Sequence, residues 1–119
     1  MSSKKIRFEV EQGVDFDSQI ITWKVGNPLA PVDLSGMKAR ALARLTTDSD
    51  DVLFNLTTEN GGITLGGTNG TIKLALTGAQ SQSYKWRVAI CFLDIFDPTG
   101  RIIKRFDADV YIKPFLNAP

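Results

Sequence analysis

The sequence predicts an all-β protein, an antiparallel two-sheet β-sandwich of Ig-like or jelly-roll-like character with about eight strands. Two observations carry this prediction. Apolar and polar residues alternate with a period of two over long parts of the chain, as in strands with one buried and one solvated face. Clusters of Gly, Pro, Asn and Asp separate these parts at the short intervals expected of hairpin-built sheets.

Four segments alternate most clearly. In the first of them, Ile6 and Phe8 stand on either side of Arg7, so that apolar and charged groups point to opposite faces. The four segments are residues 5–10, 38–45, 71–77 and 105–113. Leu42 is an exception, because it interrupts the polar face of the second segment between Arg40 and Arg44.

Two other runs are apolar on both faces, residues 20–25 with Trp23 and residues 86–96 with Trp86. Strands of this kind are either central in a sheet or covered by a partner on their second face. An exposed apolar strand would otherwise favour aggregation. We therefore expect these two runs to lie in the core or at an interface.

Turn residues divide the chain between these runs. The clearest turn is Asp97-Pro98-Thr99-Gly100, whose residue types suit a type I turn that joins the last two strands as a tight hairpin. Residues 77–84, from Thr77 to Tyr84, lack alternation and predict one short helical turn between strands. Other turns are expected at residues 26–28, 34–36, 47–51, 59–62 and 66–70.

The length of 119 residues suits one domain with one core. We expect residues 1–119 to form a single β-sandwich domain, with an ordered core from about residue 5 to residue 114 and a short tail at residues 115–119. The start of the chain lacks the apolar stretch of a signal peptide, and no run is long enough to span a membrane as a helix. We expect no membrane partner.

Composition excludes several chemistries. The chain has no histidine, which removes the commonest general base and metal ligand, and its one cysteine, Cys91, cannot form an internal disulfide. Cys91 lies in an apolar run and is expected to be a buried small hydrophobe. The net charge is +1 and basic residues are dispersed, so no nucleic-acid partner is expected. No catalytic residue, cofactor or metal is predicted.

The remaining polar candidates have simpler explanations. Acidic residues gather in one loop, but their spacing does not match a calcium loop, and a solvated hairpin loop explains them. Asp94 and Asp97 form an acid pair by spacing alone, and turn formation accounts for Asp97. The glycine-rich segment at residues 61–67 lacks the Gly-Lys-Ser/Thr ending of a phosphate loop. The acidic loop residues are Asp48, Asp50 and Asp51, with Glu59 nearby.

Aromatic residues offer a stacking platform for sugars or bases as a further possibility. Trp23 and Trp86 lie within strongly apolar runs, so core packing is favoured for both. Tyr111 is the better contact candidate, because it lies on the polar face of its strand beside Asp109 and Lys113.

One ordered set of segments resembles a known family. It runs through residues 21–24, Pro31-Val32-Asp33-Leu34-Ser35-Gly36, Ala39-Arg40-Ala41, residues 56–66, residues 70–74, the turn at residues 97–100 and a final strand. In this order the segments resemble the small β-sandwich domain of tailed-phage virion proteins, similar to the N-terminal domain of the upper baseplate protein BppU. The resemblance extends from about residue 16 to residue 114. It departs at residues 91–95, where relatives often carry Tyr-Asp-Leu.

The resemblance implies a non-enzymatic structural or adaptor protein of a phage virion, placed in the tail, baseplate, neck or fibre attachment and made in the host cytoplasm. Its partners would be other virion proteins or copies of itself, as a homo-oligomer. A capsid decoration protein, a carbohydrate-binding module and a small phage-encoded inhibitor of a host protein are alternatives. The residues expected to form the interaction surface are Leu42, Tyr111, Phe115 and Leu116.

Overall fold

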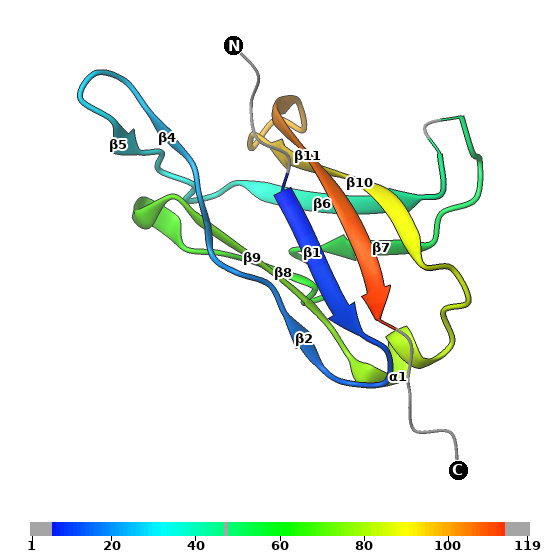
Figure 1. Ribbon diagram of the computed structural model, residues 1–119. Helices are drawn as coiled ribbons and strands as arrows, with labels where there is room; N and C mark the ends of the chain where they lie inside the picture. Colours follow the sequence, from blue (N-terminus) through cyan, green and yellow to red (C-terminus); the bar gives the residue numbers. More distant parts are fainter. Residues whose placement is uncertain (1–5, 47, 114–119) are drawn as a thin grey trace.

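The computed structural model describes residues 6–46 and 48–113. Within them the largest sheet has five strands in the order β1-β11-β10-β6-β7 (Figure 1). These strands are β1 (Ile6–Glu11), β11 (Ile102–Lys113), β10 (Val88–Phe96), β6 (Lys38–Arg44) and β7 (Phe54–Thr57).

The other strands are shorter and form two smaller sheets. The four-stranded sheet has the order β2-β9-β3, with β8 also paired to β9, and the remaining two strands pair with each other. The strands of the four-stranded sheet are β2 (Phe16–Asp17), β3 (Ile21–Thr22), β8 (Ile63–Leu65) and β9 (Thr71–Leu76). The two-stranded sheet consists of β4 (Lys24–Val25) and β5 (Ala30–Pro31).

The prediction of an all-β protein is confirmed, since the described residues form several sheets and one short α-helix. The expectation of purely antiparallel pairing is wrong at one place, because β1 runs parallel to β11. These are the first and last strands, and only long crossovers can connect parallel neighbours. The strand count also exceeds eight, because four of the strands are two-residue pieces.

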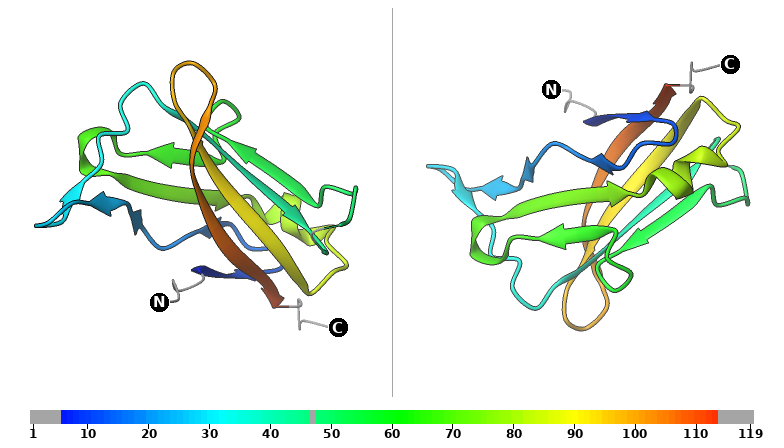
Figure 2. Two further views of the ribbon diagram at one scale, coloured as in Figure 1. Left: turned by 90° about the horizontal axis from the view of Figure 1, so that it is seen from above. Right: turned by 90° about the horizontal axis from the view of Figure 1, so that it is seen from below.

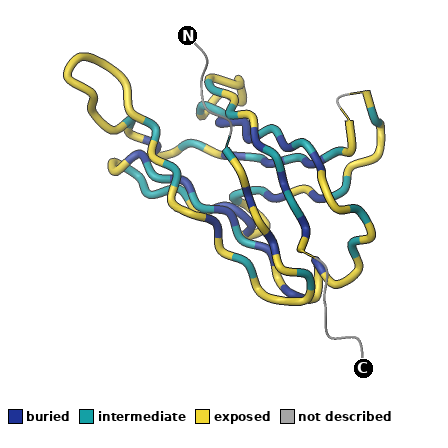
Figure 3. Tube along the Cα trace, in the orientation of Figure 1, coloured by how far each residue is buried: buried dark blue, intermediate teal, exposed yellow. Residues whose placement is uncertain are grey.

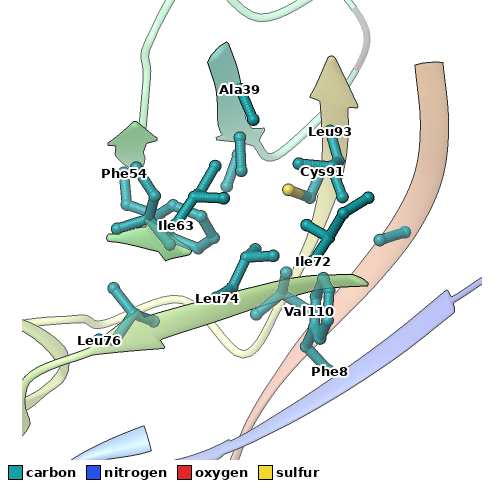
Figure 4. Packing of buried hydrophobic residues seen from close by; sticks show 14 of the residues in the cluster. Phe8, Ala39, Phe54, Ile63, Ile72, Leu74, Leu76, Cys91, Leu93 and Val110 are labelled. Atoms are coloured by element: carbon teal, nitrogen blue, oxygen red, sulfur yellow. The ribbon is translucent and has the colours of Figure 1, made fainter. Parts of the chain in front are cut away.

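Residues of the five-stranded sheet and of the four-stranded sheet contribute to one apolar core. Figure 4 shows Ile72 and Leu74 of β9 among Cys91 of β10 and Val110 of β11. All four are at most 1% exposed. Alternation produces this core directly, because the inward positions of each strand carry its apolar residues.

The run at residues 20–25 is not a central strand, which was one of the two positions predicted for it. It is split between β3 and β4, and Ile20 and Val25 are 57% and 52% exposed. β4 and β5 form an arm that extends away from the rest of the fold (Figures 1 and 2). Figure 3 shows the arm as largely exposed, and Leu29 within it is 69% exposed.

The predicted helical turn is confirmed as α1 (Gly78–Gln82). The Thr77 side chain accepts a hydrogen bond from the Gln80 amide, and the Gln80 side chain accepts one from the Thr77 amide, which forms a capping box. The turn at residues 97–100 joins β10 to β11 as predicted, with the Gly100 amide bonded to the Asp97 carbonyl at 2.9 Å.

Candidate protein-docking face

β10 is a central strand of the five-stranded sheet and carries apolar residues on both of its faces. Its odd-numbered side chains from residue 89 to residue 95 point into the core and are at most 1% exposed. Val88, Ile90 and Phe92 point to the opposite face, where Val88 is 48% exposed and the other two are half-buried. We call this the outer face of the sheet.

Leu42 extends the apolar residues of β10 onto β6, because it lies directly opposite Phe92 in the antiparallel register. Leu42 is half-buried, and its neighbours on the same face of β6 are arginines. We define the outer stripe as Leu42, Val88, Ile90 and Phe92. Arginines lie beside the stripe on β6 and aspartates beside it on β11, and apolar surface bordered by charged groups is typical of a protein interface.

Tyr111 lies at the edge of the outer stripe, since it pairs with Val88 across β10 and β11. The Arg7 guanidinium lies 3.9 Å from the centroid of the Tyr111 ring, a cation–π geometry. Arg7 also forms an ion pair of 2.7 Å with Glu9. The structure therefore brings together Leu42 and Tyr111, two of the predicted surface residues, on one face of one sheet.

Asp94 follows Phe92 by two residues on β10 and is the one charged residue of that strand. It is 2% exposed and accepts hydrogen bonds from Arg105 Nε at 2.6 Å, Arg105 Nη2 at 3.0 Å and Arg40 Nη2 at 3.3 Å. The hydrogen bonds to Asp94 raise the pKa of Arg105. This charged cluster links β6, β10 and β11 and closes one end of the stripe.

Both arginines of this cluster also cover aromatic rings of β10. The Arg105 guanidinium lies 5.0 Å from the centroid of the Phe92 ring, and that of Arg40 lies 5.1 Å from the centroid of Phe96. Their alkyl and guanidinium groups shield the rings from water while the charges stay accessible. The acid pair considered from the sequence, Asp94 with Asp97, is thus divided between an ion-pair cluster and a turn.

Asp97 organises the hairpin between β10 and β11. One of its carboxylate oxygens accepts hydrogen bonds from Thr99 Oγ1 at 2.6 Å and from the amides of Thr99 and Arg101 at 3.0 Å. The Thr99 hydroxyl and these amides hold the pKa of Asp97 below its usual value. Its role is structural, as the turn prediction indicates.

Within the described part of the chain, no three acidic or cysteine side chains are grouped closely enough to hold a metal ion together. In the loop after β6, Arg44 Nη1 donates a hydrogen bond to the Ser49 carbonyl at 3.0 Å.

A hollow of about 340 Å³ has Asp15 and Asp17 in its wall. Asp15 accepts from the Gly78 amide at 2.7 Å, and Asp17 pairs with Lys73 at 3.8 Å.

The aromatic residues have separate structural partners. Trp23 packs edge-to-face on Phe106 with ring centroids 6.2 Å apart, and Trp86 stacks on Tyr84 with centroids 5.0 Å apart. Both tryptophans are half-buried against the core, as predicted. Tyr111 lies on the outer face instead, so the three residues do not make one stacking platform.

Cys91 points from β10 into the core and is fully buried. Burial, with a smaller contribution from the negative charge of Asp94, raises the pKa of the thiol to about 12. A neutral buried thiol is a packing group, in agreement with the sequence prediction.

Sequence reasoning did not assign Val88, Ile90 and Phe92 to the interaction surface, although it identified the run that contains them. The missing information was the strand order, which places β10 between β6 and β11. Phe115 and Leu116, also predicted for that surface, lie outside the described residues.

Comparison with protein-family models and with curated proteins finds no match. No helix of the described residues has the length and apolar character needed to cross a membrane.

Proposed function

We propose that this protein is a non-enzymatic structural or adaptor protein of a tailed-phage virion that docks through the outer face of its five-stranded sheet. In this proposal the two larger sheets form an Ig-like or jelly-roll-like β-sandwich, as in the family that the sequence resembles. Its position in the virion is the tail, the baseplate, the neck or the fibre attachment.

The observation that carries the docking role is the apolar outer face of β10. Val88, Ile90 and Phe92 are consecutive outward residues of a central strand, and Leu42 lies beside them. Apolar groups at the centre with charged groups around them are typical of surfaces that are covered in an assembly. A strand whose outer face is solvated would instead alternate apolar and polar residues along its length, as β1 and β9 do.

Purified particles of the phage that encodes the chain test this proposal by quantitative mass spectrometry. We expect the protein at a fixed copy number per particle and in the tail fraction after heads and tails are separated. Recovery in the head fraction would favour a decoration protein, and absence from the particles would contradict the proposal.

A substitution links the position in the virion to the outer face. Ile90→Glu places a charge in the middle of the stripe, and we expect it to remove the protein from particles when it replaces the natural chain. Leu29→Glu is the matched control, since it adds the same charge at an exposed residue of the arm. Equal incorporation of both variants would show that docking uses another surface.

A further inference from the structure

β7 is an edge strand of the five-stranded sheet. It pairs with β6 on one side, and among the described residues no strand pairs with its other side. A free edge carries backbone N–H and C=O groups that can accept a strand from another chain. The sheet could therefore be extended at this edge.

The outward backbone groups of β7 belong to Asn55 and Thr57. In an antiparallel pair, residues that bond to the partner strand alternate with residues whose N–H and C=O groups point away from it. The Thr58 amide bonds to the Ala39 carbonyl of β6 at 3.1 Å, so Thr57, one residue earlier, faces outward. By the same alternation Asn55 also faces outward.

The side chain of Asn60 occupies two of these outward groups. Its Oδ1 accepts a hydrogen bond from the Thr57 amide at 2.9 Å, and its Nδ2 donates one to the Asn55 carbonyl at 3.0 Å. An added strand needs the same amide and the same carbonyl, whichever direction it runs. The carboxamide of Asn60 therefore takes the place of a neighbouring strand.

The turn after β7 holds Asn60 in this position. The Asn60 amide donates to Thr57 Oγ1, and the Gly62 amide donates to Asn60 Oδ1, both at 2.9 Å. A Cβ on Gly62 would lie 2.7 Å from Leu56 Cδ2 and 3.0 Å from Asn60 Oδ1, so this close approach requires glycine. The bonds use the carboxamide oxygen as acceptor and its nitrogen as donor, which fixes the orientation of the group.

We propose that Asn60 is an edge cap, a side chain that keeps β7 from pairing with β7 of a second copy of this chain. The second copy is the strand to be excluded, because β7 contains no charged residue and two such edges would meet without charge repulsion. Each copy presents the same edge, and a two-fold axis would join two five-stranded sheets into one. The cap directs association of the protein to other surfaces.

The opposite edge of the same sheet has a related contact. β1 is the edge strand there, and Gln19 Nε2 donates to the Arg7 carbonyl at 3.2 Å. β1 also exposes the charged side chains of Arg7, Glu9 and Glu11. Charged residues on an edge strand oppose strand addition by themselves. β7 lacks such residues, so its protection depends on Asn60.

One substitution removes the cap. We expect Asn60→Ala to self-associate at least roughly tenfold more strongly than the natural chain, measured by sedimentation of the whole protein over a concentration series. Asn69→Ala is the matched control, since Asn69 is an exposed asparagine that also precedes a glycine, and it should behave as the natural chain does. Circular dichroism verifies that each variant is folded. Equal self-association of the two variants would overturn the proposal.

A second substitution separates strand addition from loosening of the turn. Asn55→Pro deletes an outward N–H and places a ring on the free edge, without removing a backbone bond to β6. We expect the double variant Asn60→Ala with Asn55→Pro to associate as weakly as the natural chain. Association that persists or increases in the double variant would show that it arises from a loosened turn, and the edge cap would be refuted.

Hydrogen exchange of the Thr57 amide reports on the edge alone. In the natural chain this amide is bonded to Asn60 and should exchange slowly at every protein concentration. In Asn60→Ala it should exchange faster in dilute solution and become protected again as the concentration rises. An amide that stays unprotected in associated Asn60→Ala would contradict pairing through β7. Contacts of the outer face do not affect this measurement, so such a result would leave the proposed function standing.

Discussion

The Nε of Arg105 lies 2.6 Å from the Oδ1 of Asp94, its direct neighbour across β10 and β11. Arg40 reaches the same carboxylate from the opposite side at 3.3 Å. One buried charge therefore connects three strands of the sheet. It also separates the apolar stripe of the outer face from the hairpin at residues 97–100.

Removal of this carboxylate is expected to destabilise the fold. Asp94→Ala leaves both guanidinium groups without their common acceptor, and we expect a loss of about 2 kcal/mol in the free energy of unfolding. This loss is smaller than for a fully buried ion pair, because the side chains of Arg40 and Arg105 are 37% and 49% exposed and can be solvated by water. Urea unfolding measures this change. Asp107→Ala, on the exposed flank, is the control, and equal effects of the two substitutions would contradict a special role for Asp94.

Stability at high pH should depend on Cys91. The pKa of this thiol is about 12 in the folded state and close to 8.5 in an unfolded chain. Since the folded pKa is raised, the contribution to stability is complete below pH 8.5 and is lost as pH rises toward 12. We expect the natural chain to lose up to about 1.4 kcal/mol per pH unit more than Cys91→Ala in this range. Parallel pH profiles of the two proteins would refute the prediction.

The same thiol should be unreactive in the folded protein. At pH 8 only about one in ten thousand Cys91 side chains is ionised when the pKa is about 12. Alkylation should therefore be slower in the native state than in urea by more than roughly a thousandfold. Labelling followed by mass spectrometry gives both rates.

The turn carboxylate should titrate at low pH. The Thr99 hydroxyl is the main cause of the lowered pKa of Asp97, so Thr99→Val should move that pKa up toward the usual aspartate value. Thr99→Ser retains the hydroxyl and should keep the pKa low. Because the folded pKa is depressed, the associated stability is present above the unfolded pKa and disappears as pH falls through the folded one. Carboxyl NMR titration measures the shift, and equal pKa values in the two variants would contradict it.

Two glycines with positive φ should respond differently to a methyl group. A Cβ on Gly70 would lie 2.8 Å from the Trp23 carbonyl oxygen and 3.0 Å from the Val32 amide, whereas a Cβ on Gly36 meets nothing within 4 Å. Gly36→Ala should cost about 1 kcal/mol from backbone conformation alone. Gly70→Ala should cost about 1–3 kcal/mol more, because backbone atoms must move. Thermal unfolding compares them, and similar costs would show that the strand contact relaxes easily.

The sequence by itself predicted the local features of the fold. Alternation located β1, β6, β9 and β11, since side chains on a strand point to opposite faces whatever the strand pairs with. The turn at residues 97–100 and the short helix α1 were predicted because Asp97 and Thr77 bond to backbone groups close to them in sequence. These interactions span only a few residues and need no knowledge of the rest of the chain.

Only the tertiary structure decided which apolar residues share a surface. Ile20 and Val25 are apolar residues of an apolar run, like the outward residues of β10. Ile20 comes directly before β3 and Val25 ends β4, so neither lies at the centre of a sheet. The outer stripe exists because β6 and β11 pair with β10 in one register, which aligns Leu42 with Phe92 and Tyr111 with Val88. Strand order depends on packing between residues far apart in the chain, and periodicity within one strand carries no information about its neighbours.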